Sequence, residues 1–171
     1  MKVDNGTLNY RVYEDAVNYF GMAEVTLPDI ESMAEEIKGA GISGAFSGVF
    51  MGHVNAMTVA FNFRSVTTDI TKLMEPRSHQ IQLLASQQLW NSEAGEFAET
   101  PVKHILIGTP AKYSPGKVAP ASPTETSVEL AVSYFATFIN GVKVTEVDPI
   151  NCIYFMNGKD WLATTRRNIG M

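Results

Sequence analysis

The chain of 171 residues has little cysteine, no excess of positive charge and no long apolar run. Cys152 is its single cysteine, which excludes a disulfide framework and a cysteine-rich metal site. The formal net charge is −5, whereas a protein that grips nucleic acid usually presents a basic face. The apolar runs are too short to span a membrane, and residues 1–15 lack the apolar centre of a secretory signal. We therefore expect assembly in the cytoplasm of the cell that makes the protein.

Motifs that carry chemistry are also scarce. Residues 39–44, Gly-Ala-Gly-Ile-Ser-Gly, match G-x-G-x-x-G, but dinucleotide binding needs this motif between a strand and a helix, and no βαβ pattern surrounds it. Gly116-Lys117 precedes valine rather than serine or threonine, so it is not a phosphate loop. Three isolated histidines lack the spacing of a metal site: His53, His79 and His104. The sequence predicts no catalytic, cofactor or metal site, and hence no enzyme.

One acidic cluster remains: Asp29, Glu31, Glu35 and Glu36. Paired carboxylates can serve in acid–base catalysis, but a solvated or interface surface is the commoner reason for such a cluster. We interpret it as such a surface.

Alternation of apolar and polar residues is the main positive signal. In residues 56–63 the odd positions are large and apolar and the even ones small or polar, which predicts a half-buried strand. Residues 126–139 repeat the pattern, with Val128, Leu130 and Val132 on one face. Phe135 and Ile139 interrupt the opposite, polar face. Both strands are expected to pack one face on a core.

Turn residues divide the rest of the chain into further strands. Asn140-Gly141 and Asn157-Gly158 are typical of tight hairpin turns. The predicted strands are 8–13 and 17–27, joined around Glu14-Asp15, then 79–90, 102–107, 142–147 and 150–156. Gly108-Thr109-Pro110 is expected to end the strand at 102–107. The fold predicted is mainly β (α+β), an antiparallel sandwich or barrel in a single domain, 1–171.

Two short helices are predicted beside these strands. The first begins at Thr67 or Thr68 and stops at Pro76, and the second begins near Lys159-Asp160 and ends before Gly170. Residues 28–38 have apolar side chains at helical spacing, which by itself predicts a third helix. Residues 39–52 are rich in glycine, and 108–126 hold four prolines, so both are predicted to be irregular. Long loops of this kind are usually functional or disordered.

An ordered series of residues resembles one family over nearly the whole chain, from about Leu27 to the end. The series resembles the major tail tube proteins of contractile-tailed phages and R-type bacteriocins. Its members are Leu27-Pro28-Asp29-Ile30-Glu31, Gly39-Ala40-Gly41-Ile42-Ser43-Gly44, Gly52-His53, the run from Gly141 to Asn151, Met156-Asn157-Gly158, Leu162 and Ile169-Gly170-Met171.

This resemblance implies hexameric rings that stack into a hollow tube inside a sheath. The tube is driven through a target envelope and, in a phage, passes DNA. The implied partners are other copies of the chain, a tail sheath protein outside, and baseplate and terminator proteins at the ends. Residues 28–38 are extended in such proteins, so we expect a strand there, contrary to the periodicity.

Two sets of site residues follow from the resemblance and the pattern together. Residues 39–52 become a ring-joining loop, with 108–126 as a Pro-rich loop or arm. The inter-ring contacts are predicted at Gly39, Gly41, Phe46, Val49, Phe50 and Met51, because exposed apolar side chains on a flexible loop indicate burial by a partner. The small or polar faces of the alternating strands are predicted to line the lumen with Thr58, Asn62, Gln80, Gln82, Glu129 and Ser133.

Alternatives stay open at this point. The polar faces could be an ordinary exposed side of an antiparallel sheet. The tube could belong to a DNA-free R-type bacteriocin or a related injection system rather than to an infectious phage. A soluble binding protein or small enzyme on a β-sandwich would instead require a pocket. Microscopy of the native particle, with or without a filled capsid, separates phage from bacteriocin.

Overall fold

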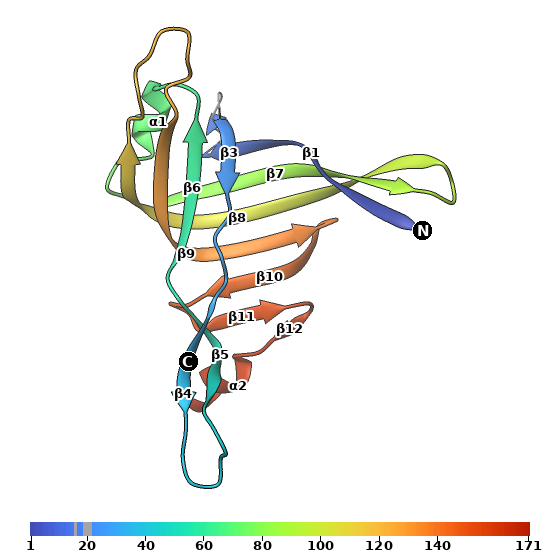
Figure 1. The fold of residues 1–171 in the computed structure, drawn as a ribbon, viewed down its shortest axis with the longest axis vertical. Coiled ribbons are helices and arrows are strands. Elements are labelled where there is room, and N and C mark those ends of the chain that lie inside the picture. The colour runs from blue at the N-terminus through green and yellow to red at the C-terminus, as the bar shows by residue number, and fades with distance from the viewer. Residues whose placement is uncertain (16, 19–21) are drawn as a thin grey trace.

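The computed structural model describes residues 1–15, 17–18 and 22–171, and its fold is mainly β, as predicted (Figure 1). The two helices are short, α1 (Thr68–Lys72) and α2 (Ala163–Asn168). The strands are β1 (Lys2–Glu14), β2 (Val17–Asn18), β3 (Met22–Thr26), β4 (Ser32–Ile37), β5 (Phe46–Val54), β6 (Met57–Phe63), β7 (His79–Asn91), β8 (Glu96–Ser114), β9 (Thr126–Ile139), β10 (Val142–Asp148), β11 (Ile153–Met156) and β12 (Lys159–Asp160).

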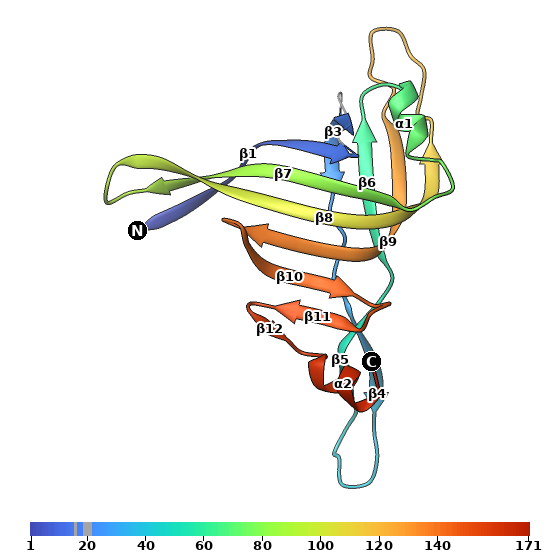
Figure 2. The same cartoon turned by 180° about the vertical axis from the view of Figure 1, so that it is seen from behind.

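Most strands belong to one antiparallel sheet in the order β12-β11-β10-β9-β8-β7-β1-β2. Strand β9 also pairs with β6, which in turn pairs with β3. The first half of β9 therefore lies between β6 and β8, and its second half between β10 and β8. Figures 1 and 2 show the consequence, because β3, β6 and the first half of β9 run across the direction of β7, β8 and β10.

The sheet turns where the pairing register of β8 and β9 shifts by one residue. Ile107 pairs with Tyr134 but Gly108 pairs with Val132, so Ser133 has no opposite residue and forms a bulge. Gly108 suits this corner, because an added Cβ atom would lie 2.9 Å from the Ala131 carbonyl oxygen. Bulges bend a strand and change which side chains share a face. This explains why Phe135, on the polar side of the simple alternation, is buried in the core.

The core fills the concave side of this bend. Val59 and Phe61 of β6 and Val128 of β9 are fully buried, as their alternation predicts. Ile70 and Leu73, from α1 and its end, cover the same core beside Ile81 of β7. Burial of such side chains is the main stabilising contribution to a fold of this size, roughly 1.5–3 kcal/mol each.

Strand β8 corrects two predictions about proline. It runs from Glu96 through Pro101 and Pro110 to Ser114, so Gly108-Thr109-Pro110 does not end it and the irregular segment shrinks to 115–125. Strand β7 pairs with β8 only as far as Gly108, and β9 only from Val102 onwards. Each proline thus lies where β8 has a single paired neighbour, and a missing N–H is tolerated at an edge.

Of the predicted strand 17–27, Val17–Asn18 form β2, which pairs with β1, and Met22–Thr26 form β3, which pairs with β6, while residues 19–21 lie outside the described part. Two other predicted boundaries are wrong. Strand β11 begins only at Ile153, since the Asp148 carboxylate accepts the backbone N–H groups of Ile150 and Asn151, each at 3.1 Å. Helix α2 begins at Ala163 because Lys159 and Asp160 pair with β11.

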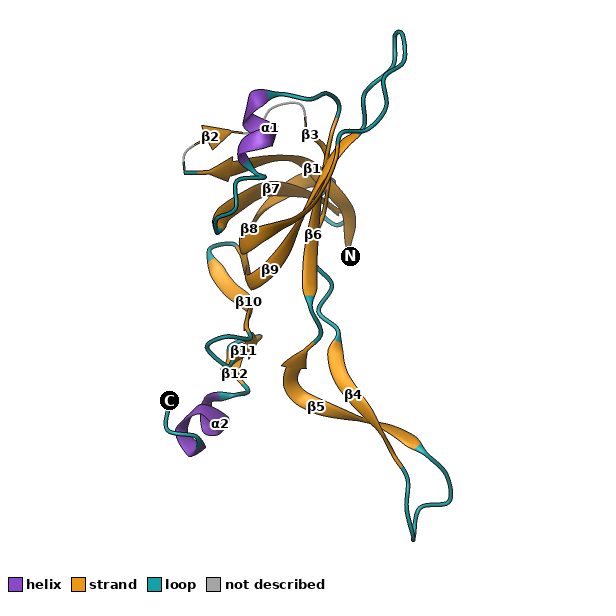
Figure 3. Cartoon of the chain, turned by 90° about the vertical axis from the view of Figure 1, so that its left-hand side faces the viewer, coloured by secondary structure: helices purple, strands orange, loops and turns teal. Residues whose placement is uncertain are grey.

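Strands β4 and β5 form a separate two-stranded sheet that projects from the body at one end of the molecule (Figure 3). Residues 32–37 are therefore a strand, in agreement with the extended conformation that the resemblance implies for 28–38, and the helix indicated by periodicity is wrong. Residues 46–52, predicted to be part of an irregular loop, are a strand. The apolar spacing misleads here because the hairpin has no core to face, and Met33 and Ile37 are 47% and 43% exposed.

The described ranges contain no helix with the length and apolar character needed to cross a membrane.

Candidate assembly surfaces

The β4–β5 hairpin gathers the predicted inter-ring residues in one place. Phe46, Val49, Phe50 and Met51 of β5 are 54%, 63%, 51% and 55% exposed. Gly39 and Gly41 lie in the turn that joins the two strands, where Gly41 adopts φ +87°. Side chains of this size and polarity on a projecting element are a surface for a partner. Their role in joining rings stays a prediction.

The hairpin is irregular near its base. Ser32 pairs with Val54 and Ala34 pairs with Val49, so β4 has one residue between these pairs whereas β5 has residues 50–53. The extra residues of β5 cannot continue the ladder and bulge outward. Phe50 and Met51 belong to this bulge, whereas Phe46 and Val49 are exposed although both pair with β4.

The same bulge brings the hairpin against the C-terminal helix. Gly52 has φ +75°, and a Cβ atom there would lie 2.7 Å from the Leu162 side chain, which is 6% exposed. A second link joins the two chain segments at the base, because the Asn55 N–H donates to the Glu31 carbonyl at 2.8 Å. The contacts that hold the hairpin to the rest of the subunit are thus at its base.

The segment that carries Leu162 is itself held by an ion pair. The Arg166 guanidinium donates to Asp160 Oδ2 at 2.5 Å and to the Cys152 carbonyl at 2.8 Å. The hydrogen bond from Arg166 lowers the pKa of the Asp160 carboxyl below its usual value. These bonds fix α2 against β11 and β12, and so fix the support of Gly52.

The predicted lumen residues all lie outside the core, but the structure separates them into two groups. Thr58, Asn62 and Glu129 lie on the outer face of β6 and β9, where Lys112 Nζ is 3.4 Å from Glu129 Oε1. Gln80 and Gln82 lie on the outer face of β7, beyond the bend. Their lumenal role is untested by this arrangement and stays a prediction.

Ser133 stands between the two groups at the bulge. Its hydroxyl donates to the Ile107 carbonyl at 3.2 Å and is partly buried. Its exposure is intermediate, like that of Asn62 and Glu129, and its lumenal role also stays a prediction.

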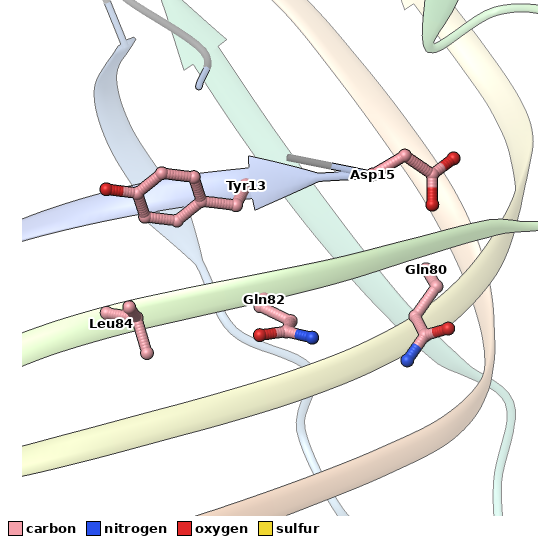
Figure 4. Close-up of a pocket in the computed structure, with 5 residues that line it drawn as sticks. All are labelled: Tyr13, Asp15, Gln80, Gln82 and Leu84. Atoms are coloured by element: carbon pink, nitrogen blue, oxygen red, sulfur yellow. The ribbon is translucent and has the colours of Figure 1, made fainter. Parts of the chain in front are cut away.

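Gln80 and Gln82 border a hollow on the surface (Figure 4). The hollow has a volume of about 350 Å³ and is lined by Tyr13, Asp15, Gln80, Gln82 and Leu84. Its amides and phenol can form hydrogen bonds with water or a passing ligand. In the described ranges, no group of three or more His, Cys, Asp or Glu residues is placed to hold a metal ion.

One buried polar cluster was not predicted from the sequence, which showed only that His79 lacks the spacing of a metal site. His79 and Glu14 are both almost fully buried and in contact through Nδ1 and Oε1. Arg77 Nη2 lies 3.2 Å from the same Glu14 oxygen, and the Glu75 carbonyl lies 3.1 Å from His79 Nε2. The cluster ties β1 to β7 and the segment after α1. Nothing in the sequence pairs residues so far apart.

A mainly β subunit whose exposed apolar side chains gather on a projecting hairpin has the construction of a self-assembling structural protein. Comparison with known proteins agrees: residues 7–170 match the family model of the phage tail tube protein FII, and the chain belongs to that family. The tail tube protein of Escherichia phage P2 is 27% identical over 166 residues, which cover 94% of each chain. The chain is a structural subunit of a phage tail tube, and it assembles with itself and with other tail components.

Proposed function

We propose that the chain forms hexameric rings that stack into the hollow inner tube of a contractile tail. A sheath protein surrounds this tube, baseplate and terminator proteins close its ends, and contraction drives it through the target envelope. The observation that carries the proposal is the β4–β5 hairpin, whose large apolar side chains lie outside the core of their own subunit. The hairpin joins one ring to the next.

The sheet edges support lateral closure of each ring. Strand β1 pairs with β7 along one edge. On its other edge, β2 pairs only with Tyr13 and Glu14, so within the described ranges that edge has no paired neighbour from Lys2 to Val12. An exposed strand edge is a template for pairing with another chain. A neighbouring subunit that pairs here extends the sheet around the ring.

The charge of the subunit suits the passage of DNA. Each chain contributes a net charge of −5, and every ring carries a multiple of it. Such a field repels phosphate rather than binding it. The lumen then has neutral or acidic side chains that do not retain the duplex: Thr58, Asn62, Gln80, Gln82, Glu129 and Ser133.

Replacing Phe46 and Phe50 by serine tests the function of the hairpin. Both side chains are about half exposed, so the double variant keeps its fold, measured by circular dichroism, but loses tube formation, measured by electron microscopy. Ile150→Ser is the matched control, because Ile150 is 72% exposed on a turn of the main body. Normal tubes from the double variant would show that the joint lies elsewhere.

A further inference from the structure

A second exposed apolar segment lies at the end of the molecule opposite to the hairpin. Residues 115–125 form a loop that projects beyond α1, whereas the turn of the β4–β5 hairpin projects from the other end of the long axis (Figures 1 and 3). Val118 in this loop is 99% exposed, and its neighbours Ala119, Pro120 and Ala121 are exposed as well. The apolar residues of the loop tip thus add nothing to the core of their own subunit.

Hydrogen bonds hold this loop in one shape. The Lys117 N–H donates to the Thr124 carbonyl, and the Thr124 N–H donates to the Arg64 carbonyl, both at 2.8 Å. The Thr126 hydroxyl donates to the Pro115 carbonyl at 3.1 Å. Prolines at 115, 120 and 123 further restrict the backbone. A segment ordered before binding loses little conformational entropy when it docks.

The hairpin offers a surface of matching chemistry. Met33, Ala34, Glu35, Phe50 and His53 line a hollow of about 370 Å³ on it. The loop tip carries exposed Val118, Ala119 and Pro120, and apolar side chains of this kind can be buried in an apolar hollow that contains an aromatic ring. The net charges also correspond. Residues 28–38 carry four carboxylates against Lys38, which pairs with Glu36 at 3.4 Å. At the loop, Lys117 pairs with Glu125 at 2.8 Å, and Arg64 adds a positive charge at its base.

We propose that loop 115–125 of one copy docks in the hollow between Met33 and Phe50 on the hairpin of the next copy. The two surfaces differ and lie on elements that project in opposite directions along the long axis (Figure 1), so the contact is head-to-tail and leaves a free surface at each end of every stack. Such a contact adds rings without limit, whereas a self-complementary contact stops at a pair. This inference rests on the proposed function and identifies the partner surface of the hairpin.

Disulfide trapping tests the joint. A chain with Met33→Cys and Val118→Cys, in a Cys152→Ala background, is assembled and then oxidised. Met33 lies on β4 and Val118 lies in loop 115–125, and these two elements are on different sides of the main body (Figure 1), so a disulfide between the two new thiols joins two copies. Because each copy carries both halves of the joint, the denatured, non-reduced product is a ladder of one, two, three and more chains. Each single cysteine variant gives dimers at most.

The matched control is Ile150→Cys with Val118→Cys, which places the first thiol on an exposed turn of the main body. This chain is expected to assemble and to give no ladder. Tubes of the Met33→Cys and Val118→Cys chain that give no ladder, or an equal ladder from the control, would overturn the proposed joint and leave the tube function standing. Folded wild-type and Cys152→Ala chains that form no tubes would overturn both.

Discussion

Alanine at Gly52 would place a Cβ atom 2.7 Å from Leu162 at the base of the hairpin. Two effects destabilise this variant. The backbone at Gly52 has φ +75°, and an L-residue in the left-handed region costs roughly 1–2 kcal/mol. The Leu162 side chain is buried and must move, and overpacking of this kind costs about 1–3 kcal/mol. We expect a loss of about 2–5 kcal/mol in the free energy of unfolding.

Gly41→Ala separates the two effects. Gly41 has φ +87° but no atom within 4 Å of an added Cβ, so only the backbone penalty of roughly 1–2 kcal/mol applies. Urea denaturation followed by circular dichroism and by the fluorescence of Trp161, next to Leu162, measures both variants. In a double-mutant cycle, Leu162→Ala should remove the overpacking and show a coupling of about 1 kcal/mol or more with Gly52→Ala. A loss no larger for Gly52→Ala than for Gly41→Ala would refute the contact between hairpin and helix.

Two further predictions concern pH and the lumen. Burial, together with the hydrogen bond to Glu146, raises the pKa of Tyr134 to about 12. The unfolded chain therefore releases this proton near pH 10 while the folded chain keeps it, so the free energy of unfolding falls as pH rises from about 10 to about 12. Tyr134→Phe should remove this part of the fall in the free energy of unfolding, measured by urea denaturation at a series of pH values. The same pH dependence in wild type and variant would show that Tyr134 is not its cause. In a Thr58→Cys chain with a Cys152→Ala background, the new thiol should not be labelled by a maleimide too large for the bore when the tubes are intact. The same thiol should be labelled in dissociated subunits. Rapid labelling of intact tubes would place this face of the sheet outside.

The strands that carry the core could be predicted from the sequence. In β6 and the first half of β9, one face packs on the core and the other does not, so burial imposes period two on residues such as Val59, Phe61 and Val128. The hairpin turns at Asn140 and Asn157 also follow from local chemistry. Both residues have positive φ and precede a glycine, which tight turns require.

Other features depend on neighbours that the sequence does not show. Residues 28–38 have helical spacing, but Met33 and Ile37 are exposed, and only the family resemblance indicated the strand at 32–37. The length of β8 depends on which of its edges are paired at Pro101 and Pro110. The bulge at Ser133 depends on a slip in the register of β8 and β9.

Side-chain clusters from distant segments are the least accessible to sequence reasoning. The contact of Glu14 with His79 requires the antiparallel pairing of β1 with β7, and the contact of Gly52 with Leu162 requires the whole fold. The exposed residues of the hairpin were found because Phe46, Phe50 and their neighbours break the ordinary polarity of a glycine-rich segment. The sequence thus indicated which apolar side chains lie exposed on the hairpin, whereas the partner surface proposed for it required the positions of both projecting elements.

The most direct test is a cryo-electron microscopy reconstruction of tubes assembled from the purified chain. The account predicts hollow tubes of stacked rings in which the β4–β5 hairpin of each copy crosses to the adjacent ring, with Thr58 and Gln80 facing the bore. A single particle that does not stack, or a tube in which the hairpin folds back on its own ring, would contradict it.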